Sequence, residues 1–197
     1  MSIATFFLHD QFVIDEKVSA FKLTNAYRVY DAWGQQIGGI QQHKSGGQKA
    51  LGMLIGGKLL PWQYTIDDEA GNPLVTVKKG ATLMLSNISV LDAAGNVIAG
   101  IQQKWSFMKP KFTLVDAGGV VIGTIAGDWK GWNFSISDAN GREIGTINKR
   151  WAGAMKEIFT TADKYIVTIN PEVTEDQHKV AIVAAAVTID MVLKENK

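Results

Sequence analysis

The chain has 197 residues, of which 46% are hydrophobic, with 20 basic and 19 acidic side chains and a formal net charge of +1. This composition is ordinary for a globular protein and excludes a nucleic-acid binder that works through net charge, so no nucleic-acid partner is expected. Because the sequence contains no cysteine, disulfides, thiolate metal sites and a cysteine nucleophile are excluded.

The N-terminal residues 1–8 have neither the basic segment nor the cleavage pattern of a signal peptide, so we expect a cytoplasmic protein. Nothing in the composition marks a linker, and we expect one domain over residues 1–197, with strands and hairpins in 1–170. The first strand is expected over Phe6–Ile14.

One pattern recurs five times along the chain. It begins with an aromatic or aliphatic residue and a second apolar residue two positions later, and continues with Asp at +4, Gly at +7 and aliphatic residues at +10 and +13. The five Asp–Gly pairs are Asp31 and Gly34, Asp68 and Gly71, Asp92 and Gly95, Asp116 and Gly119, and Asp138 and Gly141.

Each copy predicts a β-hairpin. Alternating apolar residues indicate a half-buried strand, and Asp-x-x-Gly predicts a type I turn in which the carboxylate binds backbone N–H groups and Gly takes the positive-φ position. The two aliphatic positions are three residues apart and would face opposite sides of a regular strand. The small residues between them (Gly38, Ala99, Gly123 and Gly145) would suit a bulge or a close backbone approach.

Five hairpins with strands at Phe6–Ile14 and Tyr165–Ile169 give about twelve antiparallel strands. Closed into a barrel, twelve strands would leave a lumen wide enough for one helix, because a barrel's diameter grows with its strand number.

The segment Val180–Leu193, VAIVAAAVTIDMVL, is the only long apolar run. Its β-branched residues would suit a strand, but its length and its three central alanines favour a helix at about 174–194. Thr174 and Gln177 predict a capping box. A helix that is apolar all round belongs in a core. The carboxylate of Asp190 near its end therefore predicts a hydrogen-bonding or basic partner from a strand end near the basic rim of the barrel, the alternative being a solvated Asp190 near the mouth.

This set of hairpins with a buried final helix resembles the Tubby C-terminal-like superfamily. The IGTI and WKGWNFSISDANGREIGTI segments, and the Ala185 to Asp190 ending, are most similar to its LURP-one-related and phospholipid scramblase branch. The resemblance implies a non-enzymatic protein associated with membranes or phosphoinositides, without a cofactor. In scramblases the segment equivalent to Asn170–Asp176 is thought to bind calcium, but helix capping explains its acidic residues here equally well, so no metal site is expected.

Charge placement suggests a binding surface. The Asp-x-x-Gly turns should gather at one end of the barrel and most basic residues at the other, with Asp128 and Arg142 as exceptions. We expect anionic phospholipid or a membrane surface to contact the basic residues, or else these residues only solvate hairpin ends. The candidate lipid-binding residues are Lys104, Lys109, Lys111, Lys130, Lys149 and Arg150. Trp33, Trp62 and Trp132 are candidate interfacial anchors. The alternative function is a scaffold or regulatory module that binds a protein partner and no lipid.

Overall fold

The computed structural model describes residues 3–16, 26–43, 61–80, 87–104, 111–128, 130–149 and 164–195. The helices among these residues are α1 (Ile3–Phe6) and α4 (Asp176–Glu195). The strands are β1 (Gln11–Glu16), β2 (Ala26–Tyr30), β3 (Gln36–His43), β4 (Trp62–Asp68), β5 (Pro73–Lys79), β6 (Asn87–Asp92), β7 (Val97–Lys104), β8 (Lys111–Asp116), β9 (Val121–Asp128), β10 (Asn133–Ser137), β11 (Glu143–Asn148) and β12 (Lys164–Ile169).

The twelve strands form one closed barrel. Each strand pairs antiparallel with the next in the chain, and β1 also pairs with β12, so the sheet has no free edge. The predicted closed antiparallel barrel of about twelve strands is thus confirmed.

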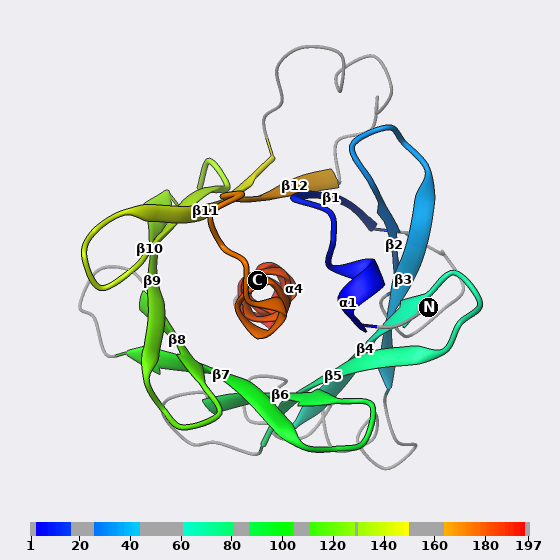
Figure 1. Ribbon diagram of the computed structural model, residues 1–197, viewed down its shortest axis with the longest axis horizontal. Helices are drawn as coiled ribbons and strands as arrows, with labels where there is room; N and C mark the ends of the chain where they lie inside the picture. Colours follow the sequence, from blue (N-terminus) through cyan, green and yellow to red (C-terminus); the bar gives the residue numbers. More distant parts are fainter. Residues whose placement is uncertain are drawn as a thin grey trace.

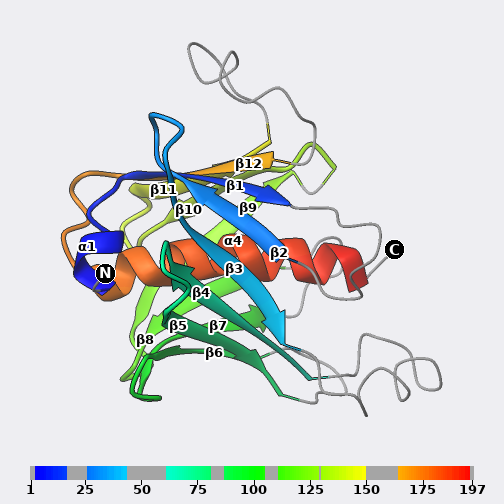
Figure 2. The ribbon, with the colours of Figure 1, turned by 90° about the vertical axis from the view of Figure 1, so that its right-hand side faces the viewer.

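The helix α4 runs along the axis of this barrel (Figures 1 and 2). Every residue from Val180 to Asp190 is at most 4% exposed, and the helix packs most closely against β7, β8 and β12. Burying a helix that is apolar on all sides stabilises the fold by roughly 25 cal/mol for each Å² of apolar surface removed from water. The inward-facing residues of the strands would otherwise line an empty lumen.

The start of α4 differs slightly from the predicted capping box. The amides of His178 and Lys179 both donate to the carbonyl oxygen of Glu175, at 3.0 and 3.2 Å. The helical bonds therefore begin at Glu175, one residue after Thr174.

The five predicted turns are all present. In each of them the glycine has a φ between 81° and 88° and its N–H donates to the carbonyl of the Asp three residues earlier. Asp138 Oδ1 also accepts hydrogen bonds of 2.9 Å from the backbone N–H groups of Asn140 and Arg142. These bonds, that of Arg142 first, lower the pKa of the Asp138 carboxyl. The turn carboxylates thus serve to close the hairpins.

The predicted bulges are present as well. In every hairpin the register shifts just after the turn, and the residue without a partner is the first of the two aliphatic positions. In β3 this residue is Ile37, which allows both Ile37 and Ile40 to face the core, at 3% and 0% exposure. Gly38 follows it because a Cβ there would lie 2.2 Å from the carbonyl oxygen of Asp67 and 2.8 Å from the Phe6 ring.

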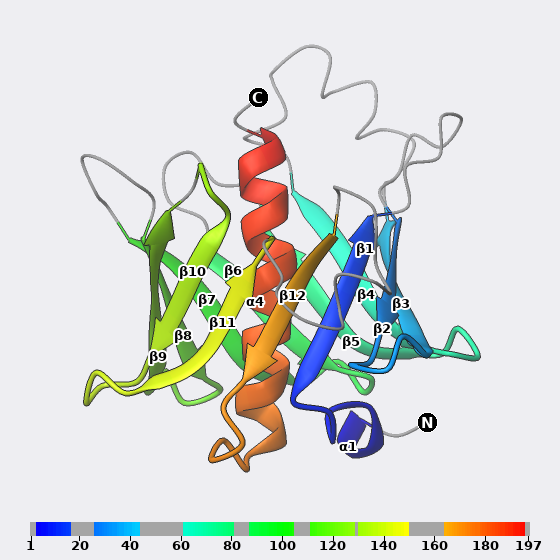
Figure 3. The same cartoon turned by 90° about the horizontal axis from the view of Figure 1, so that it is seen from above.

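The N-terminal prediction was only partly right. The first strand is Gln11–Glu16, whereas Ile3–Phe6 is a short helix at the end of the barrel where α4 begins (Figures 2 and 3). Phe6 and Phe7 are both fully buried and stack around Phe12, with ring centroids 4.9 to 5.8 Å apart. The burial of these two rings against Phe12 holds this segment in place, and strand pairing begins only at Gln11.

Candidate functional site

The two ends of the barrel differ in charge. The five Asp-x-x-Gly turns lie at the end where α4 begins, which also carries α1 (Figure 3). At the other end, where α4 finishes, lie the described lysines at strand ends and in the β9–β10 connection. We call this the basic end, and its described lysines outside α4 are Lys78, Lys79, Lys104, Lys111, Lys130, Lys149 and Lys164.

Four of the six predicted lipid-binding residues can be placed. Lys104, Lys111 and Lys130 are exposed and Lys149 is half-buried, whereas Lys109 and Arg150 lie outside the described residues. The four come from β7, β8, the β9–β10 connection and the residue after β11, and these are successive strands of the barrel. The structure therefore gathers them along one arc of the basic end.

Two of these lysines face each other directly. Lys104 at the end of β7 and Lys111 at the start of β8 are cross-strand partners. Like charges at directly opposite positions are destabilising. Within the described part of the chain neither has an ion pair, and the Lys104 ammonium donates only to Gln102 Oε1, at 2.8 Å.

Three basic side chains outside this arc have carboxylate partners. Arg142, at the end with the turns, lies 2.6 Å from Glu172, and Lys179 lies 3.1 Å from Asp10. Lys164 at the basic end pairs with Asp15 at 3.4 Å. The arc of Lys104, Lys111, Lys130 and Lys149 therefore differs from these cations in having charge that no described carboxylate neutralises.

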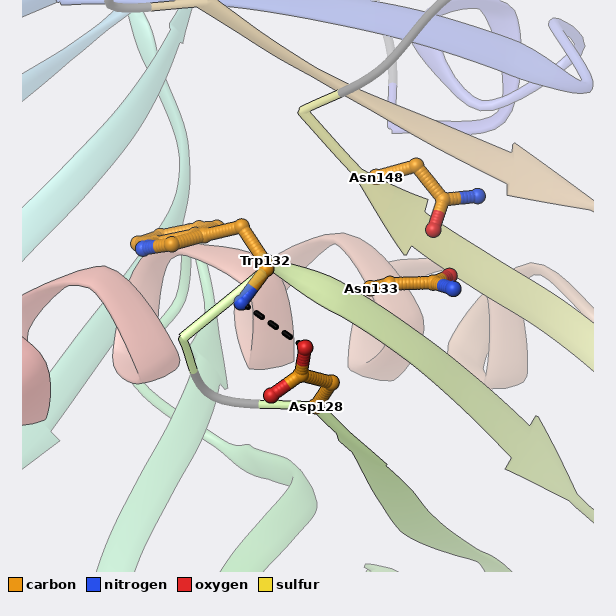
Figure 4. Close-up of a pocket in the computed structure, with 5 residues that line it drawn as sticks. Asp128, Trp132, Asn133 and Asn148 are labelled. Carbon is orange, nitrogen blue, oxygen red and sulfur yellow. Dashed lines mark hydrogen bonds between the residues drawn. The ribbon is translucent and has the colours of Figure 1, made fainter.

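A pocket of about 300 Å³ opens beside this arc (Figure 4). Its lining consists of Asp128, Gly131, Trp132, Asn133 and Asn148. Asn133 and Asn148 are cross-strand partners on β10 and β11, and Asp128 is the partner of Asn133 on β9. These three positions alternate with residues that face the core, so they point out of the barrel wall.

The pocket is built on one more Asp-x-x-Gly turn, at the opposite end from the other five. Asp128 Oδ1 accepts the N–H of Lys130, and Oδ2 accepts that of Gly131, both at 3.0 Å. A Cβ at position 131 would lie 2.6 Å from Asp128 Oδ2, so a larger residue there would displace the Asp128 carboxylate. Trp132 then takes a φ of 51°, which is unusual for a bulky residue.

Trp132 joins the pocket to the core. Its ring packs against Tyr165 and Phe134, with centroids 5.3 and 6.0 Å away, and the ammonium of Lys149 lies 4.6 Å from its centroid. A cation in this position is attracted by the negative face of the indole ring. The interaction holds the Lys149 ammonium over a ring that packs towards the core, whereas Asn133 and Asn148 point out of the wall.

The tryptophans predicted as interfacial anchors have different positions. Trp62 is only 6% exposed and packs edge-on against Tyr64, which rules it out as an anchor. Trp132 is partly buried under Lys149. Trp33 is 78% exposed but lies in the β2–β3 turn, at the end opposite the lysines.

The segment before α4 shows helix and turn contacts. Glu172 pairs with Arg142, and Glu175 lies 3.1 Å from His178 Nε2. In the part of the chain that the structure covers, no three His, Asp or Glu side chains are grouped so that they could hold a metal ion. Nor does any described helix have the length and apolar character needed to cross a membrane.

No sequence motif described above predicts the pocket. Asp128 was noted only as an exception to the charge polarity, and Asn133 and Asn148 were not noted at all. The usable signal was the sixth Asp-x-x-Gly, Asp128 to Gly131, which predicts a turn. The meeting of Asn133 and Asn148 depends on strand register, which no local motif reveals.

Comparison with known proteins supports the barrel fold described above. A protein of Arabidopsis thaliana, solved by X-ray crystallography, superposes with a TM-score of 0.56 over 96% of this chain and 95% of its own, at 9% identity. The shared fold defines the class, a Tubby-like barrel closed around a C-terminal helix. The scramblase family model matches residues 2–196, and the chain therefore belongs to the scramblase family. A comparison with curated proteins gives no match.

Proposed function

We propose that this barrel is a non-enzymatic, cytoplasmic protein that binds anionic phospholipid at a membrane surface through its basic end. The observation that carries the proposal is the arc of Lys104, Lys111, Lys130 and Lys149, and above all the cross-strand pair Lys104 and Lys111. Membership of the scramblase family supports a lipid as the partner.

Electrostatics makes this arc suitable for an anionic surface. Each cation close to an anionic membrane contributes roughly 1 kcal/mol of attraction. Binding would also relieve the repulsion between Lys104 and Lys111, because lipid phosphates would lie between the two ammonium groups. The net charge of +1 is too small to attract such a surface, so the placement of the lysines has to do so.

Lys111→Glu tests the proposal without weakening the barrel. The new carboxylate would lie opposite Lys104, where an opposite charge is favourable, so thermal stability should stay the same or rise slightly. Binding to vesicles with phosphatidylglycerol or phosphoinositide should nevertheless weaken, and flotation or sedimentation would measure it. Binding of the unaltered protein should also fall at high salt, because exposed charges are screened beyond roughly 8 Å at physiological ionic strength.

Arg142→Glu is the matched control, because it makes the same charge change at an exposed site at the other end. It should leave vesicle binding unchanged. Equal loss in both variants would show that only net charge matters. If the unaltered protein binds neutral and anionic vesicles alike, the proposal is wrong.

A second candidate function is a scaffold or regulatory module that binds a protein. Trp33 favours it, since this ring is 78% exposed in a turn far from the lysines. Recovery of a stoichiometric protein partner that is lost with Trp33→Ala, together with no vesicle binding, would favour this function.

A further inference from the structure

The residues that flank the Asp-x-x-Gly turns can be compared from one hairpin to the next. In each of the five hairpins, one residue before the turn pairs directly with one residue after it. The pairs are Tyr30 with Gln36, Asp67 with Pro73, Leu91 with Val97, Val115 with Val121, and Ser137 with Glu143. The two pairs made of aliphatic residues belong to β6–β7 and β8–β9, which are neighbouring hairpins. The other three hairpins form without an aliphatic pair, so the turn itself does not require one.

The two aliphatic pairs face away from the lumen. Val90 and Leu114, which come one residue before Leu91 and Val115, are fully buried in the core. Because successive strand residues face opposite sides of a sheet, the pairs lie on the outer wall. Val97 and Val121 are accordingly 50% and 46% exposed.

The two pairs join into one row. Gly100 of β7 pairs with Val115 of β8, and a Cβ at Gly100 would lie only 3.0 Å from Val115 Cγ2, so Val115 packs over β7. The bulge in β7 turns both Ile98 and Ala99 into the core, which makes Val97 the next outward residue after Gly100. We call the four residues the aliphatic row: Leu91, Val97, Val115 and Val121.

Val120 extends the row into the β8–β9 turn. The equivalent residues of the other four hairpins are all polar: Gln35, Asn72, Asn96 and Arg142. The Asn96 side chain donates to Asp92 Oδ2 at 3.0 Å, whereas Val120 has no donor in its side chain and is 67% exposed. The Asp116 carboxylate accepts the Val120 N–H at 2.8 Å, and no described side chain donates to it. An aliphatic residue here therefore gives up a turn contact that other hairpins make.

Carboxylates border the aliphatic row. Asp92 and Asp116 close the two turns beside it, and no described lysine or arginine pairs with either. Arg142 and Lys179, at the same end of the barrel, have carboxylate partners of their own. Contiguous exposed apolar surface marks an interaction site, and bordering charge selects the partner. A complementary partner therefore carries aliphatic and basic side chains, whereas an anionic bilayer would be repelled.

The closed sheet limits how such a partner binds. An extended peptide can add to an open sheet edge through its backbone, but β1 pairs with β12 and leaves no such edge. The partner must therefore bind through its side chains. An amphipathic helix presents one aliphatic face and can carry basic residues along the margins of that face.

We propose that the aliphatic row, together with Val120, Asp92 and Asp116, binds an amphipathic helix with basic margins from a partner protein. This interaction goes beyond the lipid contact proposed above and does not rest on it. The row lies at the end with the turns, so a helix bound there leaves the lysines of the basic end accessible to a membrane.

Two designed peptides of identical composition test the proposal. Both contain leucine, lysine and alanine, but only one has its leucines spaced to form one face of a helix, and the other has a scrambled order. The unaltered protein should bind the amphipathic peptide about tenfold more tightly, because its aliphatic face is buried in only that complex. Fluorescence anisotropy of labelled peptides measures both affinities. Equal binding would show that only the carboxylates attract the peptides and would overturn the proposal, as would no binding of the amphipathic peptide.

The repeat itself supplies substitutions that suit the hairpins. Val97→Gln combined with Val121→Gln gives both strands the residue that β3 has at this position, Gln36, so thermal stability should stay the same. The double variant should bind the amphipathic peptide about tenfold more weakly. Leu8→Gln is the control, because it removes an aliphatic side chain that is 72% exposed but lies outside the row. Equal losses in the two variants would overturn the assignment, and the comparison of the two peptides holds even if the double variant is unstable.

Other occupants of the row would give different results. Dimerisation of the unaltered protein that is lost in the double variant would overturn the proposal in favour of an interface between two copies of this chain. The double variant should keep its binding to anionic vesicles, and a loss would overturn the proposal in favour of a membrane-contacting row. Failure of the peptide test leaves the proposed lipid contact intact, and absence of vesicle binding by the unaltered protein leaves the helix-binding row intact.

Discussion

The hydroxyl of Tyr27 donates a 2.5 Å hydrogen bond to Asp190 Oδ2 and thereby connects the second strand of the wall to the end of the central helix. Asp190 is only 4% exposed, and a carboxylate near a helix C-terminus opposes the helix dipole. Such a group is tolerated in a core when it is hydrogen-bonded. The partner that the sequence predicts for Asp190, from a strand end near the basic end, is thus Tyr27.

Tyr27→Phe should therefore destabilise the fold. The variant keeps the ring but removes the donor to a buried carboxylate, which costs about 1–3 kcal/mol in the free energy of unfolding. Urea or thermal unfolding would measure the loss.

Tyr165→Phe is a closely matched control. The Tyr165 hydroxyl is buried and lacks a hydrogen-bond partner among the described residues, so its removal should be neutral or stabilising. Equal losses in the two variants would show that the Tyr27 hydrogen bond contributes nothing specific.

The same tyrosines predict a loss of stability in alkali. Burial, more than any other cause, raises the pKa of Tyr27 and of Tyr165 above 10.0, and the charge of Asp190 adds to both shifts. Their neutral forms are favoured in the fold, so this contribution is fully present below pH 10 and is lost as the pH rises towards the folded-state pKa values. Above pH 10 each tyrosine should lower the unfolding free energy by about 1.4 kcal/mol per pH unit.

Urea unfolding at several alkaline pH values would measure this slope, and the double variant Tyr27→Phe, Tyr165→Phe separates it from the titration of lysines. The variant should lose less stability per pH unit than the unaltered protein. Parallel curves for the two proteins would contradict the prediction.

Features encoded locally were predictable from the sequence, and those that depend on register were not. The Asp31 and Gly34 pair, like the four later Asp–Gly pairs, specifies a turn through the hydrogen bonds of the carboxylate and the conformation of the glycine. A long apolar run with a central Ala185 specifies a buried helix. In contrast, Asn133 meets Asn148 only because β10 and β11 align in one register. The burial of Trp62, by contrast, could have been predicted locally, because it precedes Tyr64 by two residues and such residues share one face of a strand.

Gly38→Ala should be strongly destabilising, because the new methyl group would lie 2.2 Å from the backbone oxygen of Asp67, which cannot move without disturbing β4. Overpacking of this kind typically costs about 1–3 kcal/mol or more. Gly80→Ala is the control, since a Cβ there meets nothing within 4 Å. A thermal midpoint for Gly38→Ala equal to that of Gly80→Ala would show that β3 and β4 are not so close.

The strongest test of the architecture lies in the middle of α4. Ala185 is fully buried, with strands all around the helix, so Ala185→Trp adds an indole ring where the barrel has no room. We expect a loss above the usual 1–3 kcal/mol for overpacking, because a closed barrel cannot open on one side to accommodate it. Ala126→Trp, at an exposed position of β9, should change stability by about 0.5 kcal/mol at most.

Truncation after Asn170 removes the helix altogether, and it should leave an insoluble chain because the apolar lining would face water. A truncated chain that stays soluble and keeps its β-sheet circular dichroism would show that the barrel closes without its helix, and α4 would then be an appendage.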